Sequence, residues 1–314
     1  MKLCIGMAVY DDYDGPWFSL MALRMYHQDV AHDVEYVVID NCPQSDNGTR
    51  LAGEIHSWMP DVRYVAMPEP TGTSAPRNRI FEEASQESMV VCMDSHVLLD
   101  VGGLQAFMDW YEATTSVRDD LFTGPMVYPN LETYSTHMTD TWGAGMWGQW
   151  ASSPAGKLKR HTIRNGDTVS VGVDCGPPFE INAMGLGLFA ARKDSWLGFN
   201  PKFKDFGGEE FYIHTKYRQH GRKCWSIPQL RWMHRFNQTV AYPASIESRL
   251  HNYVIGLTEL GLPLEPAINH FTGFMEEIVV ERIIQEALDR DDKLERLREE
   301  RRRIDMEISV CEGA

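Results

Sequence analysis

The first 94 residues alternate between short apolar runs and segments whose apolar residues recur at helical spacing. The apolar runs predict strands at residues 2–9, 34–40, 62–67 and 88–94. The segments between them predict helices at residues 16–28, 47–59 and 75–86. Strands that alternate with helices form parallel sheets with crossover helices. The order therefore predicts an α/β fold, Rossmann-like, with a mostly parallel central sheet flanked by helices.

Composition narrows the class of protein. The 314 residues are 43% hydrophobic and 24% charged, which suits one large globular domain or a domain with an appendage. The six cysteines form no C-x-x-C pair, which favours a reducing compartment. No apolar stretch is long enough for a membrane span or a signal peptide, so we expect a soluble, cytoplasmic protein. The net charge of −15 disfavours duplex nucleic acid as a partner without excluding it.

The run "VVCMDSHVLL" places an acid and an imidazole at the end of a predicted buried strand. Asp94 and His96 are two residues apart, so both side chains can turn toward one point beyond the strand. A carboxylate oxygen and an imidazole nitrogen suit Mn²⁺ or a similar divalent cation. The alternative is an aspartate that caps the following turn and a surface histidine. Asp40 also ends a strand, so we expect Asp40 and Asp94 at the same edge of the sheet.

From about residue 121 the pattern becomes irregular, as in a lid or a binding loop. The stretch "TWGAGMWGQW" contributes Trp142, Trp147 and Trp150, which either pack under a loop or form a mobile lid with stacking surfaces for a sugar or an acceptor. Residues 207–221 then predict a helix, and residues 223–236 predict one strand.

Two glutamates open the predicted helix at residues 207–221. Glu209 and Glu210 are candidates to hold or deprotonate a hydroxyl group, with Glu209 favoured. The alternative is an acidic first turn that complements the helix dipole.

Beyond about residue 243 the pattern is almost wholly helical. We expect a domain at residues 1–242 and a C-terminal helical extension at residues 243–314, which either packs on its own domain or mediates self-association into a homo-oligomer. One apolar stripe in it comprises Val280, Ile283, Ile284, Ala287 and Leu288.

Residues 90–100 together with 185–236 resemble the catalytic domain of the polypeptide N-acetylgalactosaminyltransferases, and more broadly the family 2 glycosyltransferases of the GT-A fold. The resemblance spans about residues 2–240 and includes "MDSH", "DFGGEE" and "WMHRF". It implies that Mn²⁺ binds the donor diphosphate through three ligands, Asp94, His96 and His234. It also implies that Gly207, Gly208 and Glu209 open a helix beside the acceptor.

The same resemblance assigns the donor side of the site. Asp40 is similar to the aspartate that hydrogen-bonds the uracil ring, and Ala8 and Tyr10 match positions that cover the uridine. Arg77 matches an arginine at a helix start, where it bridges to the diphosphate or to Asp94; its alternative role is a salt bridge that braces the sheet edge.

The implied function is a metal-dependent glycosyltransferase that moves a hexose or N-acetylhexosamine from a UDP-sugar to a hydroxyl of a protein, a glycan or a modified nucleobase. "DFGGEEF" and Arg235 depart from the family pattern, so the resemblance predicts neither the sugar nor the acceptor geometry. The sequence does not distinguish retention from inversion of configuration. The alternatives are another nucleotide-binding transferase, such as a nucleotidyltransferase, and a non-catalytic protein that binds sugar nucleotides.

Overall fold

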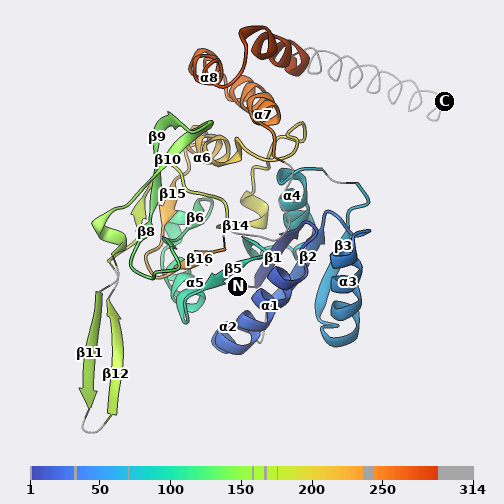
Figure 1. Cartoon of the computed structure of the whole chain (residues 1–314). Coiled ribbons are helices and arrows are strands. Elements are labelled where there is room, and N and C mark those ends of the chain that lie inside the picture. Colours follow the sequence, from blue (N-terminus) through green and yellow to red (C-terminus); the bar gives the residue numbers. More distant parts are fainter. Residues whose placement is uncertain are drawn as a thin grey trace, which may run out of the picture.

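The computed structural model describes residues 2–31, 34–69, 71–157, 159–165, 168–174, 176–235 and 244–288. In this part of the chain a central sheet is flanked by helices, and a four-stranded sheet and two β-hairpins accompany it (Figure 1). The helices are α1 (Asp14–Tyr26), α2 (Gln28–Ala31), α3 (Asp46–Trp58), α4 (Ser74–Glu83), α5 (Gly103–Ala113), α6 (Glu209–Gln219), α7 (Ile246–Glu259) and α8 (Glu265–Phe271). Residues 277–288 are also helical.

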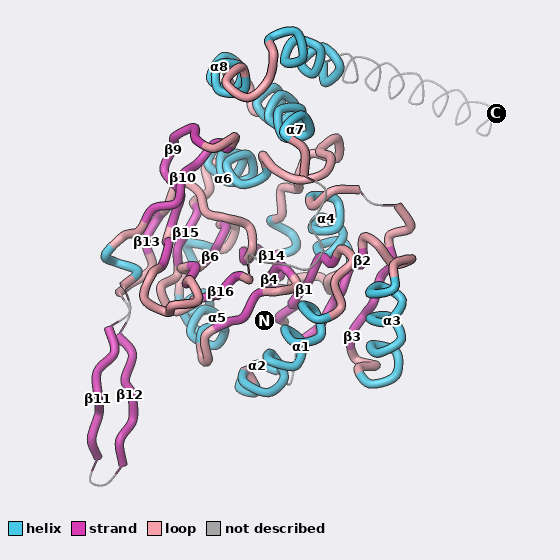
Figure 2. Tube along the Cα trace, viewed as in Figure 1, coloured by secondary structure: helices cyan, strands magenta, loops and turns pink. Residues whose placement is uncertain are grey.

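The strands fall into two groups along the chain. The first are β1 (Leu3–Val9), β2 (Val34–Asp40), β3 (Val62–Ala66), β4 (Met89–Asp94), β5 (Val97–Leu99), β6 (Leu121–Thr123), β7 (Met126–Val127) and β8 (Tyr134–Ser135). The others are β9 (His137–Gly143), β10 (Met146–Ala151), β11 (Lys159–Asn165), β12 (Thr168–Asp174), β13 (Phe179–Glu180), β14 (Leu188–Arg192), β15 (Cys224–Ser226) and β16 (Trp232–His234). Figure 2 shows how strands and helices alternate in the N-terminal half.

The α/β prediction is confirmed. The central sheet has the order β13-β15-β6-β14-β4-β1-β2-β3, and β1 runs parallel to both β2 and β4. Its middle strands are apolar because helices cover them, and residues 89–93 of β4 are all buried. Antiparallel β14 adds to β4, so the sheet is mixed but mostly parallel. Ala8 lies opposite Asp94 and Val9 opposite Asp40, which places both aspartates at the carboxyl edge, as predicted.

The prediction of one strand at residues 223–236 is wrong. The segment contains two short strands, because β15 pairs with β6 in the central sheet while β16 enters a separate sheet of order β5-β16-β7-β8. There β16 runs antiparallel to β5, with His234 opposite Val97. This pairing brings His234 beside His96, which precedes it by 138 residues in the sequence.

The stretch expected to be irregular contains two β-hairpins. β9 pairs with β10, and β11 pairs with β12 in a hairpin that points away from the central sheet (Figure 1). Ala144 and Gly145, which join β9 to β10, have φ values of 50° and 71°. Positive φ at both residues is the type I′ geometry, which sequences usually mark with Asn-Gly or Asp-Gly. Alanine at the first position hid this hairpin from sequence analysis.

The helices after residue 243 pack on the rest of the chain. Leu250, Tyr253, Val254 and Leu257 of α7 belong to the same buried core as the central sheet, and α7 contacts α6. The division between residues 242 and 243 stays a prediction, as does self-association. Residues 289–314 lie outside the described part. No helix within the described ranges is long and apolar enough to cross a bilayer.

Candidate active site

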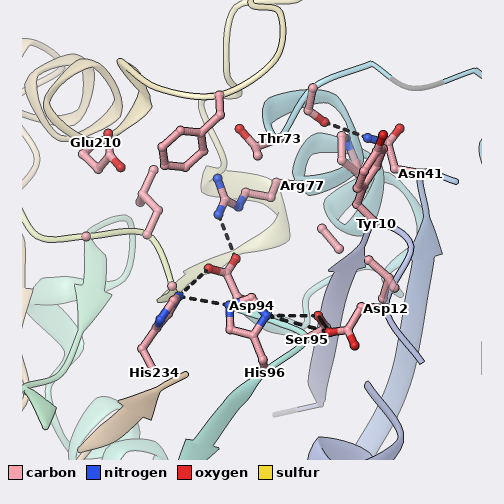
Figure 3. Close-up of a pocket in the computed structure, with 18 of the residues that line it drawn as sticks. Tyr10, Asp12, Asn41, Thr73, Arg77, Asp94, Ser95, His96, Glu210 and His234 are labelled. Carbon is pink, nitrogen blue, oxygen red and sulfur yellow. Dashed lines mark hydrogen bonds and ion pairs between the residues drawn. The ribbon is translucent and has the colours of Figure 1, made fainter. Parts of the chain in front are cut away.

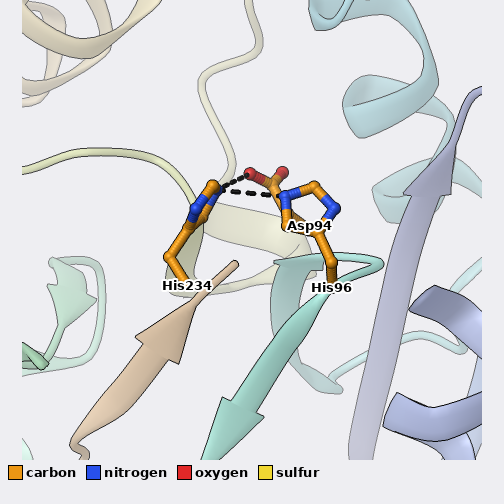
Figure 4. Close-up of side chains that lie close together, drawn as sticks. All are labelled: Asp94, His96 and His234. Atoms are coloured by element: carbon orange, nitrogen blue, oxygen red, sulfur yellow. Dashed lines mark hydrogen bonds and ion pairs between the residues drawn. The ribbon is translucent and has the colours of Figure 1, made fainter. Parts of the chain in front are cut away.

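Three candidate metal ligands meet at the ends of two sheets. Asp94 ends β4, His96 lies between β4 and β5, and His234 ends β16 (Figure 4). His96 Nε2 lies 3.1 Å from His234 Nε2, and His234 Nε2 lies 3.5 Å from Asp94 Oδ2. Adjacent ligands of an octahedral divalent ion with bonds of about 2.1 Å are separated by roughly 3 Å. One oxygen and two nitrogen donors therefore fit a single divalent cation, and this is the one such cluster among the described residues.

Arg77 of α4 is paired with the acid of this cluster. Arg77 Nη2 donates to Asp94 Oδ1 at 2.8 Å, and the arginine side chain is 7% exposed. Burial acts to raise the pKa of Asp94, but the Arg77 guanidinium and the two histidines hold it well below its usual range. Burial also lowers the pKa of His96 to about 4, against the opposing charge of Asp94. At neutral pH the cluster thus offers a carboxylate and a neutral imidazole.

Asp12, in the loop after β1, supports the cluster from outside. Ser95 Oγ donates to Asp12 Oδ2 at 3.1 Å, and the same oxygen lies 4.0 Å from His96 Nδ1. The backbone amide of Gly15 donates to the other Asp12 oxygen at 3.0 Å. Ser95 Oγ also lies 3.4 Å from His96 Nδ1, so Asp12 reaches the imidazole through Ser95, and such outer carboxylates orient metal-binding imidazoles. Asp12 was not predicted from the sequence, although its place just after the first strand, at the carboxyl edge of the sheet, was a usable signal.

A cavity of about 360 Å³ opens above the cluster (Figure 3). The residues predicted from the sequence that line it are Ala8, Tyr10, Arg77, Asp94, His96, Trp150, Glu210 and His234. Those predicted from the sequence that do not line it are Asp40, Trp142, Trp147, Gly207, Gly208 and Glu209. Tyr10 and Asn41 mark one side of the cavity, and Glu210 lies on the other side of Arg77 (Figure 3).

Asp40 is fully buried and does not line the cavity. Its Oδ1 accepts from the backbone amide of Cys42 at 2.8 Å, and its Oδ2 accepts from the Tyr64 hydroxyl at 2.7 Å. Its neighbour Asn41 reaches the cavity and donates to the Gly72 carbonyl at 3.0 Å. The residue after the strand end, Asn41, therefore lines the cavity, whereas Asp40 at the strand end does not.

The two glutamates at the start of α6 occupy different environments. Glu209 is buried and accepts hydrogen bonds from the Thr73 hydroxyl and, at 2.9 Å, from the Gly207 amide. Glu210 lines the cavity. Burial, followed by the negative charge of Glu209, raises the pKa of Glu210 to about 7. A carboxyl group that titrates near neutral pH can hold or release a proton during a reaction.

Gly207 and Gly208 shape the turn before α6. Their φ values are 110° and 96°, a region that glycine alone adopts without strain. A Cβ atom on Gly207 would lie 2.7 Å from Arg249 Nε, so a side chain has no room there.

The three tryptophans of the β9–β10 hairpin also occupy different environments. Trp142 and Trp147 stack on each other with ring centroids 5.8 Å apart, and Trp147 stacks on Phe211 of α6. These two pack between the hairpin and the helices. Trp150 faces the cavity and is 38% exposed, so among the three it is the one placed to stack on a ligand.

A family model described as "Glycosyl transferase family 2" matches residues 24–176. Among curated protein sequences, none matches this chain.

Several solved structures share the fold. GalNAc-T7, solved with UDP, GalNAc and Mn²⁺, aligns over 82% of this chain and 48% of its own, with a TM-score of 0.62 and 16% identity. TarS 1–349 from S. aureus, solved with UDP-GlcNAc, aligns over 92% of this chain and 72% of its own, with a TM-score of 0.53 and 15% identity. A mannosyltransferase from Pyrobaculum calidifontis with GDP-Man and Mn²⁺ aligns over 93% and 75%, with a TM-score of 0.50 and 15% identity. This chain spans about half the length of GalNAc-T7.

Proposed function

We propose that this chain transfers a hexose or N-acetylhexosamine from a UDP-sugar to a hydroxyl acceptor, because residues 24–176 match the family 2 glycosyl transferase model and the fold resembles that of GalNAc-T7. Mn²⁺ or a comparable divalent cation is bound by Asp94, His96 and His234. The observation that carries the proposal is the convergence of these three side chains on the floor of the cavity. GalNAc-T7 with UDP, GalNAc and Mn²⁺ and TarS 1–349 with UDP-GlcNAc support a UDP-sugar donor, and the mannosyltransferase with GDP-Man and Mn²⁺ supports the cation.

The residues around the cation position the donor. When bound, the cation supplies a Lewis acid for the departing diphosphate. Arg77 neutralises Asp94 in the absence of the donor and keeps that carboxylate ionised, so the ligand is ready to bind. Ala8 and Tyr10, at the end of β1, form the wall that covers the nucleoside, with Asn41 beside them.

Glu210 acts at the opposite end of the cavity. Its pKa of about 7 keeps a substantial fraction ionised at neutral pH, and its position away from the nucleoside wall faces the space left for the sugar and the acceptor (Figure 3). We assign it the role of accepting the proton from the acceptor hydroxyl. A base that activates the acceptor on the face opposite the leaving group inverts the configuration at the sugar.

Calorimetry with UDP tests the metal assignment. We expect UDP to bind at least about tenfold more tightly with Mn²⁺ than in EDTA, because the cation offsets the diphosphate charge. Asp94→Ala removes this dependence. The matched control is Asp109→Ala, which deletes an exposed aspartate of α5 and leaves the dependence intact. Equal UDP affinity in Mn²⁺ and in EDTA would disprove the metal site.

A UDP-release assay over several UDP-sugars then separates the remaining functions. Release of UDP, with a hexose or N-acetylhexosamine mass added to a co-purified macromolecule, identifies a glycosyltransferase and its acceptor. Tight UDP binding without release from any donor identifies a protein that only binds sugar nucleotides. Release of pyrophosphate from nucleoside triphosphates identifies a nucleotidyltransferase.

A further inference from the structure

One side of α7 carries four polar side chains directed at the candidate active site. Ser248, Arg249, Asn252 and Tyr253 recur at spacings of one and four residues, which places them on one face of a helix. Ser248 and Asn252 are buried although they are polar, so their hydrogen bonds must lie within the protein. Each of the four contacts the turn before α6 or the tip of the β9–β10 hairpin.

The first contacts hold the turn that leads into α6. Asn252 Nδ2 donates to the carbonyls of Lys204 and Gly207 at 2.8 and 2.9 Å, and its Oδ1 accepts from the Lys204 amide at 3.0 Å. The Ser248 hydroxyl donates to the Asp205 carboxylate. Asp205 has a φ of 50°, so this turn is held in a conformation that an isolated chain would rarely adopt.

The next contacts hold the tip of the hairpin. The Trp147 amide donates to the Tyr253 hydroxyl at 2.7 Å, and the Gly145 amide donates to His270 Nε2 of α8 at 3.0 Å. The same hairpin places Met146 and Trp150 in the wall of the cavity. The C-terminal helices therefore fix a part of the chain that contacts any bound substrate.

Arg249 touches both elements at once. Its Nη1 donates to the Gly145 carbonyl at 3.2 Å, and its guanidinium carbon lies 5.8 Å from the ring centroid of Phe206, another cavity residue. Its side chain lies flat against Gly207, where a Cβ atom would come within 2.7 to 3.1 Å of its Nε, Cγ and Cδ. The Arg249 side chain thus occupies the space that a side chain at position 207 would need.

We propose that Arg249 is a positioning residue of the active site, which holds the turn that leads into α6 and Glu210 at a fixed separation from the hairpin that carries Trp150. This inference rests on the proposed glycosyl transfer and deepens it. Helix α7 then contributes directly to the geometry of the active site. Arg249 itself does not line the cavity and acts through the backbone that it contacts.

The charge of Arg249 allows its role to be tested by a second measurement, the pH dependence of the rate. The ionisable groups that act on Glu210 are Glu209, which raises its pKa, and Arg77 and Arg249, which lower it against the dominant effect of burial. Removing Arg249 therefore raises the pKa of Glu210 further. A base with a higher pKa is protonated over a wider range, so the acid limb of the pH–rate profile moves to higher pH.

The experiment compares Arg249→Ala, Arg249→Lys and Arg282→Ala in the full chain. Arg282 is the matched control, because it is an exposed arginine that pairs with Glu247 and Glu286 on the outer surface. The readouts are UDP release from the UDP-sugar that the unmodified protein uses best, UDP affinity with Mn²⁺, and hydrogen exchange of peptides 144–150, 204–210 and 89–94. Peptide 89–94 contains β4 and reports on global folding.

For Arg249→Ala we expect kcat to fall on the order of tenfold or more, since small displacements of catalytic groups are costly. UDP affinity stays within about threefold, because the metal ligands lie on other elements. Exchange in peptides 144–150 and 204–210 accelerates, with β4 unchanged. Arg249→Lys keeps the acid limb of the unmodified protein but recovers only part of the turnover, since lysine lacks the planar fork.

The inference is overturned if Arg249→Ala matches Arg282→Ala in turnover, acid limb and local exchange. It is also overturned if exchange accelerates equally in β4, because the arginine then stabilises the whole fold and has no particular role at the site. If the unmodified protein releases no UDP from any donor, the proposed function fails. Hydrogen exchange alone then decides whether Arg249 holds the two elements together.

Discussion

Replacing Arg77 with methionine tests the electrostatics of the candidate site most directly. Methionine keeps an unbranched apolar stem but removes the charge that faces Asp94 at 2.8 Å. Loss of one member of a buried ion pair costs about 3–5 kcal/mol, because the other charge is left without a partner. The Asp94 side chain is 21% exposed, so water compensates in part. We therefore expect the free energy of unfolding at pH 7 to fall by about 3 kcal/mol.

The pH dependence of this loss has a defined sign. The pKa of Asp94 in the folded protein lies below its ordinary value of 3.8, so the carboxylate stabilises the fold above that pH. This contribution is lost as the pH falls toward the folded pKa. In Arg77→Met the folded pKa rises, because the opposing charge is gone. The difference between the two proteins is then largest near neutral pH and narrows below about pH 4.

The assay is urea unfolding followed by tryptophan fluorescence, without divalent cations. Arg79→Met is the matched control, since Arg79 lies on the same helix but forms exposed ion pairs with Glu82 and Glu83. Exposed pairs contribute about 0–1 kcal/mol, so the control stays close to the unmodified protein. A loss for Arg77→Met that equals the control, or a gap that widens as the pH falls, would refute the assignment of Arg77 and Asp94 as a buried pair.

Two further predictions concern catalysis and packing. Glu210→Gln should lower kcat on the order of 100-fold and flatten the rise in rate through about pH 7, with UDP affinity unchanged; a persisting rise would assign it to another group. Gly124→Ala should destabilise the fold by more than about 3 kcal/mol, because its Cβ would lie 1.6 Å from a backbone oxygen. Gly53→Ala, in α3 with open space around it, should stabilise by about 0.5–1 kcal/mol; equal urea midpoints for the two would contradict the packing argument.

The fold and part of the site follow from local patterns in the sequence. Alternating strands and helices predicted the sheet, and Asp94 and His96 are close because they are two residues apart. His234 is different, since only the pairing of β16 with β5 brings it to Asp94 and His96. It was predicted from the order of the family motifs. The β9–β10 hairpin was missed because its turn lacks the usual residues.

The two glutamates show why the rest of the site could not be predicted from the sequence alone. Consecutive residues in a helix point about 100° apart, so Glu209 and Glu210 face in different directions, and only Glu210 lines the cavity. The direction in which α6 leaves the Gly207–Gly208 turn decides which glutamate lines the cavity, and contacts with Asn252 of α7 hold that turn from 45 or more residues further along the chain. A motif therefore identifies the acidic pair, but the tertiary contacts of the turn determine which acid is available for chemistry.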